Sequence, residues 1–191
     1  MILRVAAVST LVAIHAVPAV AGDYDDMLRD LAEQQLSEWV ARAEVTQAIA
    51  AQNAKHAGLS EADITALDQE WRAGVDGGST ALIDEVLARP SSQLLAELQA
   101  ETEGLVTEVF VMDNRGLNVA QSGITSDYWQ GDEAKWQQTF SAGAGAMHFG
   151  DVEFDESSQT YQTQLSMSIV DPGSGDVIGA VTFGIDVGYL E

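Results

Sequence analysis

Apolar residues in the first half of the chain recur every three or four positions, which is the spacing of one face of an α-helix. The longest run predicts one amphipathic helix from about Tyr24 to about Lys55, and Gly58 ends it. Ser60 and Asp63 form the pattern of a capping box, which predicts the start of a second helix. Shorter helices are expected at 81–87, ended by Pro90, and at 91–104, opened by a serine cap.

After Gly104 the pattern changes to the alternation of apolar and polar residues that is typical of β-strands. The sequence predicts an α+β domain with a five-stranded antiparallel sheet, a long N-terminal helix and helical connectors, although the order of the strands cannot be read from it. The strands are expected at 105–113, 117–122, 148–155, 160–171 and 177–187, with a short helix inserted at 131–140.

Charge and residue usage exclude several classes of function. The chain has 191 residues and a formal net charge of -22, which repels phosphates and anionic lipid, so nucleic acid is not expected as a partner. No cysteine is present, and the three histidines lack the pairing of a zinc site. P-loop, dinucleotide and G-x-S-x-G motifs are also absent from the sequence. We therefore expect a protein that is not an enzyme and needs no cofactor or metal.

Residues 1–21 have the pattern of a secretory signal peptide. A basic start is followed by an apolar stretch that His15 and Pro18 interrupt, and by the cleavage pattern Ala19-Val20-Ala21. Cleavage would leave a mature chain that begins at Gly22, lies in the periplasm and is not inserted in the membrane. The alternative is an uncleaved anchor, although a membrane span needs roughly 20 apolar residues.

Three stretches resemble the extracytoplasmic PAS-like sensors called Cache or PDC domains. "VFVMDNRGLNVAQS" resembles the family's opening hairpin, "SDYWQGDEAKW" the segment after it, and "GDVIGAVTFGIDV" its closing strand. The resemblance implies a single Cache module over residues 22–191, with a helical part at 23–104 and a PAS-like sheet at 105–191. Typical family members continue into an output domain, and we expect this sequence to depart from them by having none. The resemblance further implies sensing of a small ligand and signal transduction through a partner such as a membrane receptor or kinase.

In Cache modules the ligand lies between the sheet and its covering segments, so the resemblance implies that the segment 127–136 borders the pocket. Its aromatic side chains offer flat apolar walls, and Lys135 offers a donor for a carboxylate. An amine held by the aromatic residues and Asp127 is the other ligand considered. The candidate ligand-binding residues are Asp127, Tyr128, Trp129, Lys135, Trp136, His148 and Tyr161.

The same residues also have a structural interpretation. Asp132 and Glu133 favour the start of a helix whose buried face holds Trp136, and Lys135 would then pair with one of these acids. Asp113 resembles a structural acid that ends a strand of the family. The acid-rich "DVEFDE" lacks the pattern of a calcium loop, which favours a solvated hairpin.

The alternative function is a non-catalytic structural module with a vestigial pocket that forms a homodimer through its N-terminal helix.

Overall fold

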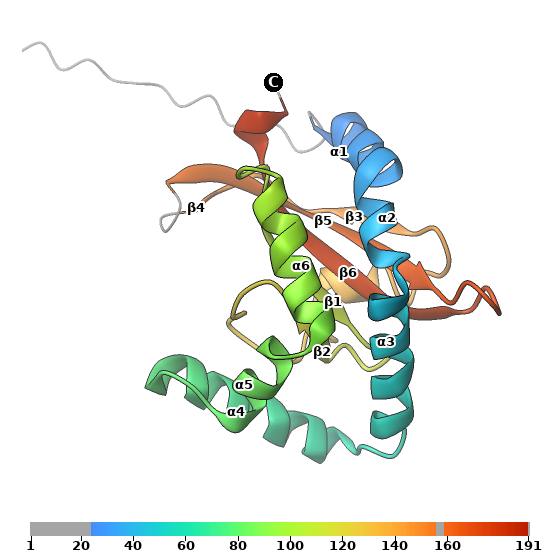
Figure 1. Cartoon of the computed structure of the whole chain (residues 1–191), viewed down its shortest axis with the longest axis vertical. Helices are drawn as coiled ribbons and strands as arrows, with labels where there is room; N and C mark the ends of the chain where they lie inside the picture. Colours follow the sequence, from blue (N-terminus) through green and yellow to red (C-terminus); the bar gives the residue numbers. More distant parts are fainter. Residues whose placement is uncertain (1–23, 156–158, 191) are drawn as a thin grey trace, which may run out of the picture.

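The computed structural model describes residues 24–155 and 159–190, and the expected signal peptide lies outside them. Helices form the first half of the described chain, and the strands follow them (Figure 1). Within these residues, no helix has the length and apolar character needed to cross a bilayer. The helices before the sheet are α1 (Asp25–Leu31), a π-helical turn (Ala32–Leu36), α2 (Ser37–Val40), α3 (Ala43–His56), α4 (Glu61–Gly77), α5 (Ala81–Leu87) and α6 (Pro90–Glu101).

The N-terminal helical region is interrupted, where the sequence predicted one continuous helix. Arg42 has an extended backbone with ψ of 142°, which separates α2 from α3. Trp39 and Val40 before the break, and Val45 and Ile49 after it, are all buried in the same core. Because the apolar spacing continues across the break, the pattern alone does not reveal it.

Helix starts agree with the sequence in one case and differ in another. Ser60 caps α4 as predicted, because its hydroxyl accepts from the backbone N–H of Asp63 while the Asp63 carboxylate accepts from the backbone N–H of Ser60. The serine cap expected for α6 is wrong, because that helix begins at Pro90 with Arg89 as its N-cap. Proline suits the first position of a helix, since the N–H that it lacks has no partner there.

All strand pairs in the described sheet are antiparallel, as the sequence predicted. The order is β2-β1-β6-β5-β3, and β4 also pairs with β5. The expected strand at 148–155 is divided at Gly150, so that two short strands pair with different parts of β5. The strands are β1 (Val106–Met112), β2 (Asn118–Gln121), β3 (Met147–Phe149), β4 (Glu153–Asp155), β5 (Thr160–Val170) and β6 (Val177–Asp186).

The two faces of the sheet have different coverings. On the inner face, Val109, Val111 and Phe183 pack in one core with residues of α1, α2, α3 and α6, and Figure 1 shows these helices in front of the sheet. We call the opposite side the outer face. There, Phe110 and Met112 pack against side chains in and after the short helix α7 (Ala134–Gln137). Because side chains alternate along a strand, β1 contributes to both cores.

Candidate functional site

The outer face is covered only in part by aromatic side chains. Trp136 and Phe140 stack with their ring centroids 4.9 Å apart and pack against Phe110 and Met112. Glu108 precedes Phe110 by two positions on β1, so alternation places it on the same face, beyond the aromatic cover. The polar part of the sheet is therefore left open next to an apolar part.

A cavity of about 490 Å³ lies over this polar part, and we call it the outer-face cavity. Strands β1, β4 and β5, the turn at Gly150 and helix α7 all contribute to its walls. Asp151, Glu153 and Phe154 are exposed at its rim, while Glu108 is half-buried. The cavity is lined by Glu108, Lys135, Gly150, Asp151, Glu153, Phe154, Asp155, Gln162, Thr163 and Gln164.

A second hollow of about 370 Å³ extends the outer-face cavity along β1. The two share Glu108, Asp155 and Gln162 in their walls. The second hollow reaches the loop after β2, and of the described residues that line it only Glu108 and Asp155 are charged. A ligand longer than the first cavity therefore has space to extend beyond these two acids, along neutral side chains of the described lining.

Glu108 is held in the cavity by its neighbours on the sheet. Glu108 on β1 lies opposite Gly184 on the neighbouring strand β6. A Cβ added to Gly184 would come within 2.7 Å of the Glu108 Cγ. The missing side chain at this position leaves room for the glutamate. Gln164 donates from its Nε2 to the Glu108 Oε1 at 3.1 Å, and no donor or cation within the described residues contacts the other oxygen.

Burial raises the pKa of Glu108 above its usual range. The hydrogen bond from Gln164 and the charge of Lys135 act in the opposite direction, and the nearby Asp155 adds to the increase. The carboxylate thus loses water without gaining a full ion pair. Such a group is ready to accept a donor from a molecule in the cavity.

Lys135 lines the cavity, but its charge is already paired. Its Nζ lies 2.9 Å from Glu133 Oε2 and 5.4 Å from the centre of the Phe110 ring, and it also donates to Gln130. The pairing with Glu133 is the structural alternative considered from the sequence. Lys135 therefore contacts the cavity as one half of an ion pair.

Tyr128 and Trp129 attach the loop after β2 to helix α4, and neither is among the residues that line the outer-face cavity. The Tyr128 ring is 1% exposed and stacks on Trp71 at a centroid distance of 5.3 Å. The backbone N–H groups of both residues donate to Asp68 Oδ1. The Trp129 indole donates to the backbone oxygen of Arg115 at 2.9 Å.

The other candidate residues have partners of their own. Asp127 forms an ion pair with Arg72 at 3.1 Å. Trp136 donates from its indole to the backbone oxygen of Asp113 at 3.1 Å. His148 on β3 lies opposite Ser166 in the pairing of β3 with β5. Tyr161 is exposed and packs edge-on against Phe154 at the rim of the cavity. Tyr161 thus contacts a cavity residue, whereas Asp127 and Trp136 hold neighbouring segments together.

Helix α7 is shorter than the helix expected at 131–140. Its N-cap is Glu133, one of the two acids expected to favour the start of the helix, and no side chain forms a capping hydrogen bond. Asp132 lies before the cap. Glu133 instead directs its carboxylate to Lys135. A turn of four residues needs no cap of its own, because the stacked Trp136 and Phe140 attach it to the sheet.

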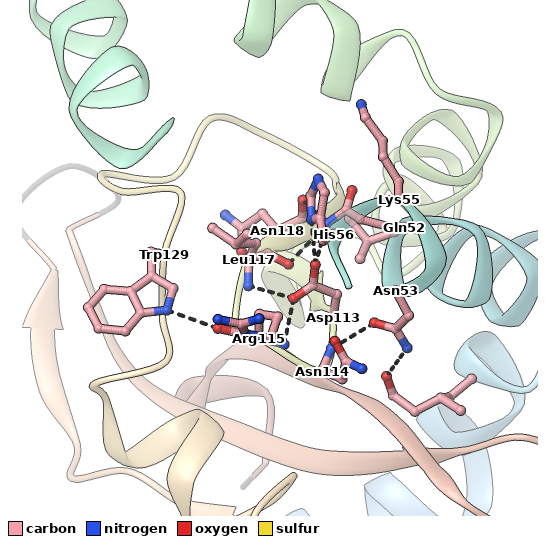
Figure 2. A network of polar contacts seen from close by, with 12 residues as sticks. Gln52, Asn53, Lys55, His56, Asp113, Asn114, Arg115, Leu117, Asn118 and Trp129 are labelled. Atoms are coloured by element: carbon pink, nitrogen blue, oxygen red, sulfur yellow. Dashed lines mark hydrogen bonds and ion pairs between the residues drawn. The ribbon is translucent and has the colours of Figure 1, made fainter. Parts of the chain in front are cut away.

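A buried polar network lies at the turn between β1 and β2 (Figure 2). Asp113 is fully buried, and its Oδ2 accepts from Gln52 Nε2 at 3.0 Å and lies 2.9 Å from His56 Nδ1. Its Oδ1 accepts from the backbone N–H groups of Arg115 and Leu117. The structural role expected for Asp113 agrees with these contacts, which attach α3 to the hairpin.

The sequence did not single out the residues that give the cavity its chemistry. Glu108 carried one signal, since a glutamate interrupts the apolar run of a strand that has a neighbouring strand on each side. Asp151, Glu153 and Asp155 were interpreted as a solvated acidic hairpin, and the structure places them in the wall of the cavity. In the described residues, no group of three or more acids or histidines could hold a metal ion.

No protein-family model matches this chain, and no curated protein does either. Among solved structures, the sensor domain of the V. cholerae histidine kinase DctB is similar, with 14% identity, a TM-score of 0.37, and coverage of 87% of this chain and 58% of that one. The ligand-binding domain of the Campylobacter jejuni chemoreceptor Tlp3, in complex with 4-methylisoleucine, has 12% identity, a TM-score of 0.40, and coverage of 90% and 65%. This chain thus spans less than two thirds of either domain, and the likeness is one of fold.

Proposed function

We propose that residues 22–191 form a single non-catalytic sensor module that binds one small polar molecule in the outer-face cavity. The observation that carries this proposal is a half-buried glutamate on the interior strand β1, facing an open cavity with one oxygen lacking a donor among the described residues. Burial of a charge without a partner destabilises a fold, so such groups are concentrated at functional sites. A ligand supplies the missing partner.

The proposed module acts outside the cytoplasm through a partner protein, such as a membrane receptor or kinase. The signal-peptide pattern of residues 1–21 supports this location, and the resemblance to Cache domains supports the role in signal transduction. The intact mass of the protein from a periplasmic fraction tests the location. A chain that begins at Gly22 is expected, whereas a membrane-bound chain that keeps Met1 to Ala21 would contradict it.

Thermal-shift screening tests the binding function directly. The purified protein is screened against organic acids, amino acids, amines and sugars. A ligand at about 100 times its Kd stabilises the folded state by about 2.7 kcal/mol, which raises the Tm by several degrees. We expect at least one compound to do so.

Two matched variants show whether a stabilising compound uses this cavity. A Cβ at Gly150 would meet Gln164 at an ordinary 3.5 Å, so Gly150→Leu fills the cavity without a backbone clash. Gly58→Leu introduces the same side chain in open space between α3 and α4. The shift should be lost in the first variant and kept in the second. If no compound stabilises the protein, or if Gly150→Leu keeps the full shift, the proposed function is wrong.

A further inference from the structure

We propose that the ligand of the outer-face cavity is an organic cation whose ammonium group binds the carboxylate of Glu108. This inference rests on the proposed function and adds the chemical class of the ligand. It starts from the second carboxylate oxygen of Glu108, which belongs to a half-buried side chain in the cavity wall and accepts no hydrogen bond from the described residues. An ammonium group supplies both a donor and a compensating charge.

The charges around the cavity favour a cation. Among the described residues, four carboxylates line it, those of Glu108, Asp151, Glu153 and Asp155. Lys135 is the one basic residue in this described lining, and its Nζ is 2.9 Å from Glu133. The net field in the cavity is therefore negative, and partly buried walls strengthen it relative to open water. A carboxylate ligand would meet this repulsion and would also have to compete with Glu133 for the lysine.

An aromatic side chain at the rim adds a contact that is independent of the acids. Phe154 lines the cavity although 48% of it is exposed, and it packs edge-on against Tyr161 with ring centroids 5.2 Å apart. The face of an aromatic ring attracts ammonium groups. A bound organic cation would cover the exposed part of this ring.

The second hollow indicates that the cation has an uncharged or flexible chain. Beyond the shared residues it is lined by neutral side chains, including Thr107, Ser122 and Ile124. An ammonium group at Glu108 therefore leaves space for several carbon atoms on either side. A linear five-carbon chain is a suitable probe, because its end groups can be changed while its length stays constant.

The experiment is isothermal titration calorimetry with three probes of equal chain length. Cadaverine carries two ammonium groups, glutarate two carboxylates and 1,5-pentanediol two hydroxyl groups. We expect binding of cadaverine and no binding of glutarate or pentanediol. Binding of glutarate in preference to cadaverine, or no binding of cadaverine, would overturn the inference.

Variants of the chain identify the residue that is responsible. Glu108→Gln keeps the shape of the side chain and removes its charge, and the Kd for cadaverine should rise roughly tenfold to a hundredfold. Glu97→Gln removes the same charge from the exposed side of α6 and should change the Kd less than about twofold. Lys135→Gln should leave the affinity unchanged or increase it. Equal effects of the two glutamate variants, or loss of cadaverine binding in Lys135→Gln, would contradict the assignment.

The pH dependence gives a second readout. Because burial raises the pKa of Glu108, protonation should weaken cadaverine binding at a higher pH than an ordinary glutamate would. In Glu108→Gln this part of the pH dependence should disappear. An identical pH profile in the wild type and the variant would count against Glu108.

Failure of this inference can be distinguished from failure of the proposed function. If cadaverine does not bind but another compound from the thermal screen binds and is blocked by Gly150→Leu, the cavity is a ligand site for a different class of molecule. If no compound in the screen binds, the proposed function itself is wrong. Circular dichroism of each variant establishes that it is folded before it is compared.

Discussion

Asp113 is a charged residue that the fold has enclosed completely, and its contacts explain how. Its two oxygens face donors from α3 and from the backbone of the β1–β2 turn, including Gln52 and Leu117. His56 lies at 2.9 Å and is itself 5% exposed. A buried carboxylate is tolerated when its lone pairs are satisfied in this way. The residue therefore joins two segments that are far apart in the sequence.

Asp113→Ala should lower the free energy of unfolding by about 3–5 kcal/mol, because the donors around it lose their acceptor and stay buried. Asp76→Ala is the control, since Asp76 is exposed on α4. That variant should change stability by less than about 0.5 kcal/mol. Urea denaturation of both variants measures the difference, and similar values would show that the network contributes little.

Because Tyr128 is buried, we expect the free energy of unfolding to depend on pH in the alkaline range. Burial raises its pKa to about 12, above the value of 10.0 expected when it is exposed. Between these two values the unfolded chain loses the proton and the folded chain keeps it, so stability falls as the pH rises. The full effect is about 2–3 kcal/mol. Tyr128→Phe should remove this part of the slope in denaturation measured from pH 9 to 12, and an unchanged slope would contradict the assignment.

At the scale of elements, the β1–β2 turn packs closely against the segment that leads to α7. Gly116 has a positive φ of 79°, and an added Cβ would lie 2.5 Å from the Cα of Gly131. The backbone N–H of Gln130 donates to the oxygen of Gly116 at 2.7 Å. The two segments are therefore in backbone contact, which positions Lys135 and Trp136 over the sheet.

Gly116→Ala should destabilise the protein more than Gly145→Ala. Gly145 has a similar φ of 76° but no atom within 4 Å of an added Cβ, so it measures the backbone strain alone. That strain should lower the free energy of unfolding by about 1–2 kcal/mol. The clash at Gly116 should add roughly 1–3 kcal/mol. Equal thermal stability of the two variants would show that the contact with Gly131 can relax without cost.

The elements were predictable where their signals are local. The Ser60 cap and the strands after Gly104 depend on neighbouring residues, and the structure agrees with both except that the strand expected at 148–155 is divided. The position of Tyr128 was not predictable, because its stacking partner Trp71 belongs to another helix. The cavity was not predictable either, since it depends on the division of the strand at Gly150 and on the order of strands in the sheet.

At the scale of the whole molecule, the charge of -22 is a source of internal repulsion. The Debye length decreases from about 30 Å at 0.01 M salt to about 8 Å at 0.15 M salt. We therefore expect the Tm to rise over this range of sodium chloride concentration. A fall in Tm would mean that attractive pairs such as Arg72 with Asp127 outweigh the repulsion.

The same charge distribution separates the outer-face cavity from other hollows of the molecule. A hollow of about 440 Å³ between α3 and α6 has Lys55 and Arg89 in its lining, and Arg89 donates to Gln52 and to Glu85. Glu44 and Glu85 also line it, and Glu85 forms ion pairs with both bases, so acids and bases are balanced there, whereas the described lining of the outer-face cavity is mainly acidic. Binding in the hollow between α3 and α6, and not in the outer-face cavity, would show in the residues whose signals the ligand changes.

Chemical-shift mapping by ¹H–¹⁵N NMR shows which hollow of the molecule binds a ligand, with cadaverine or a compound from the thermal screen as the ligand. We expect the largest changes at the backbone amides of Glu108, Gly150 and Gln164, on the outer face. Largest changes at Ala51, Lys55 and Ser91, which line the hollow between α3 and α6, would contradict the claim that the outer-face cavity is the ligand site.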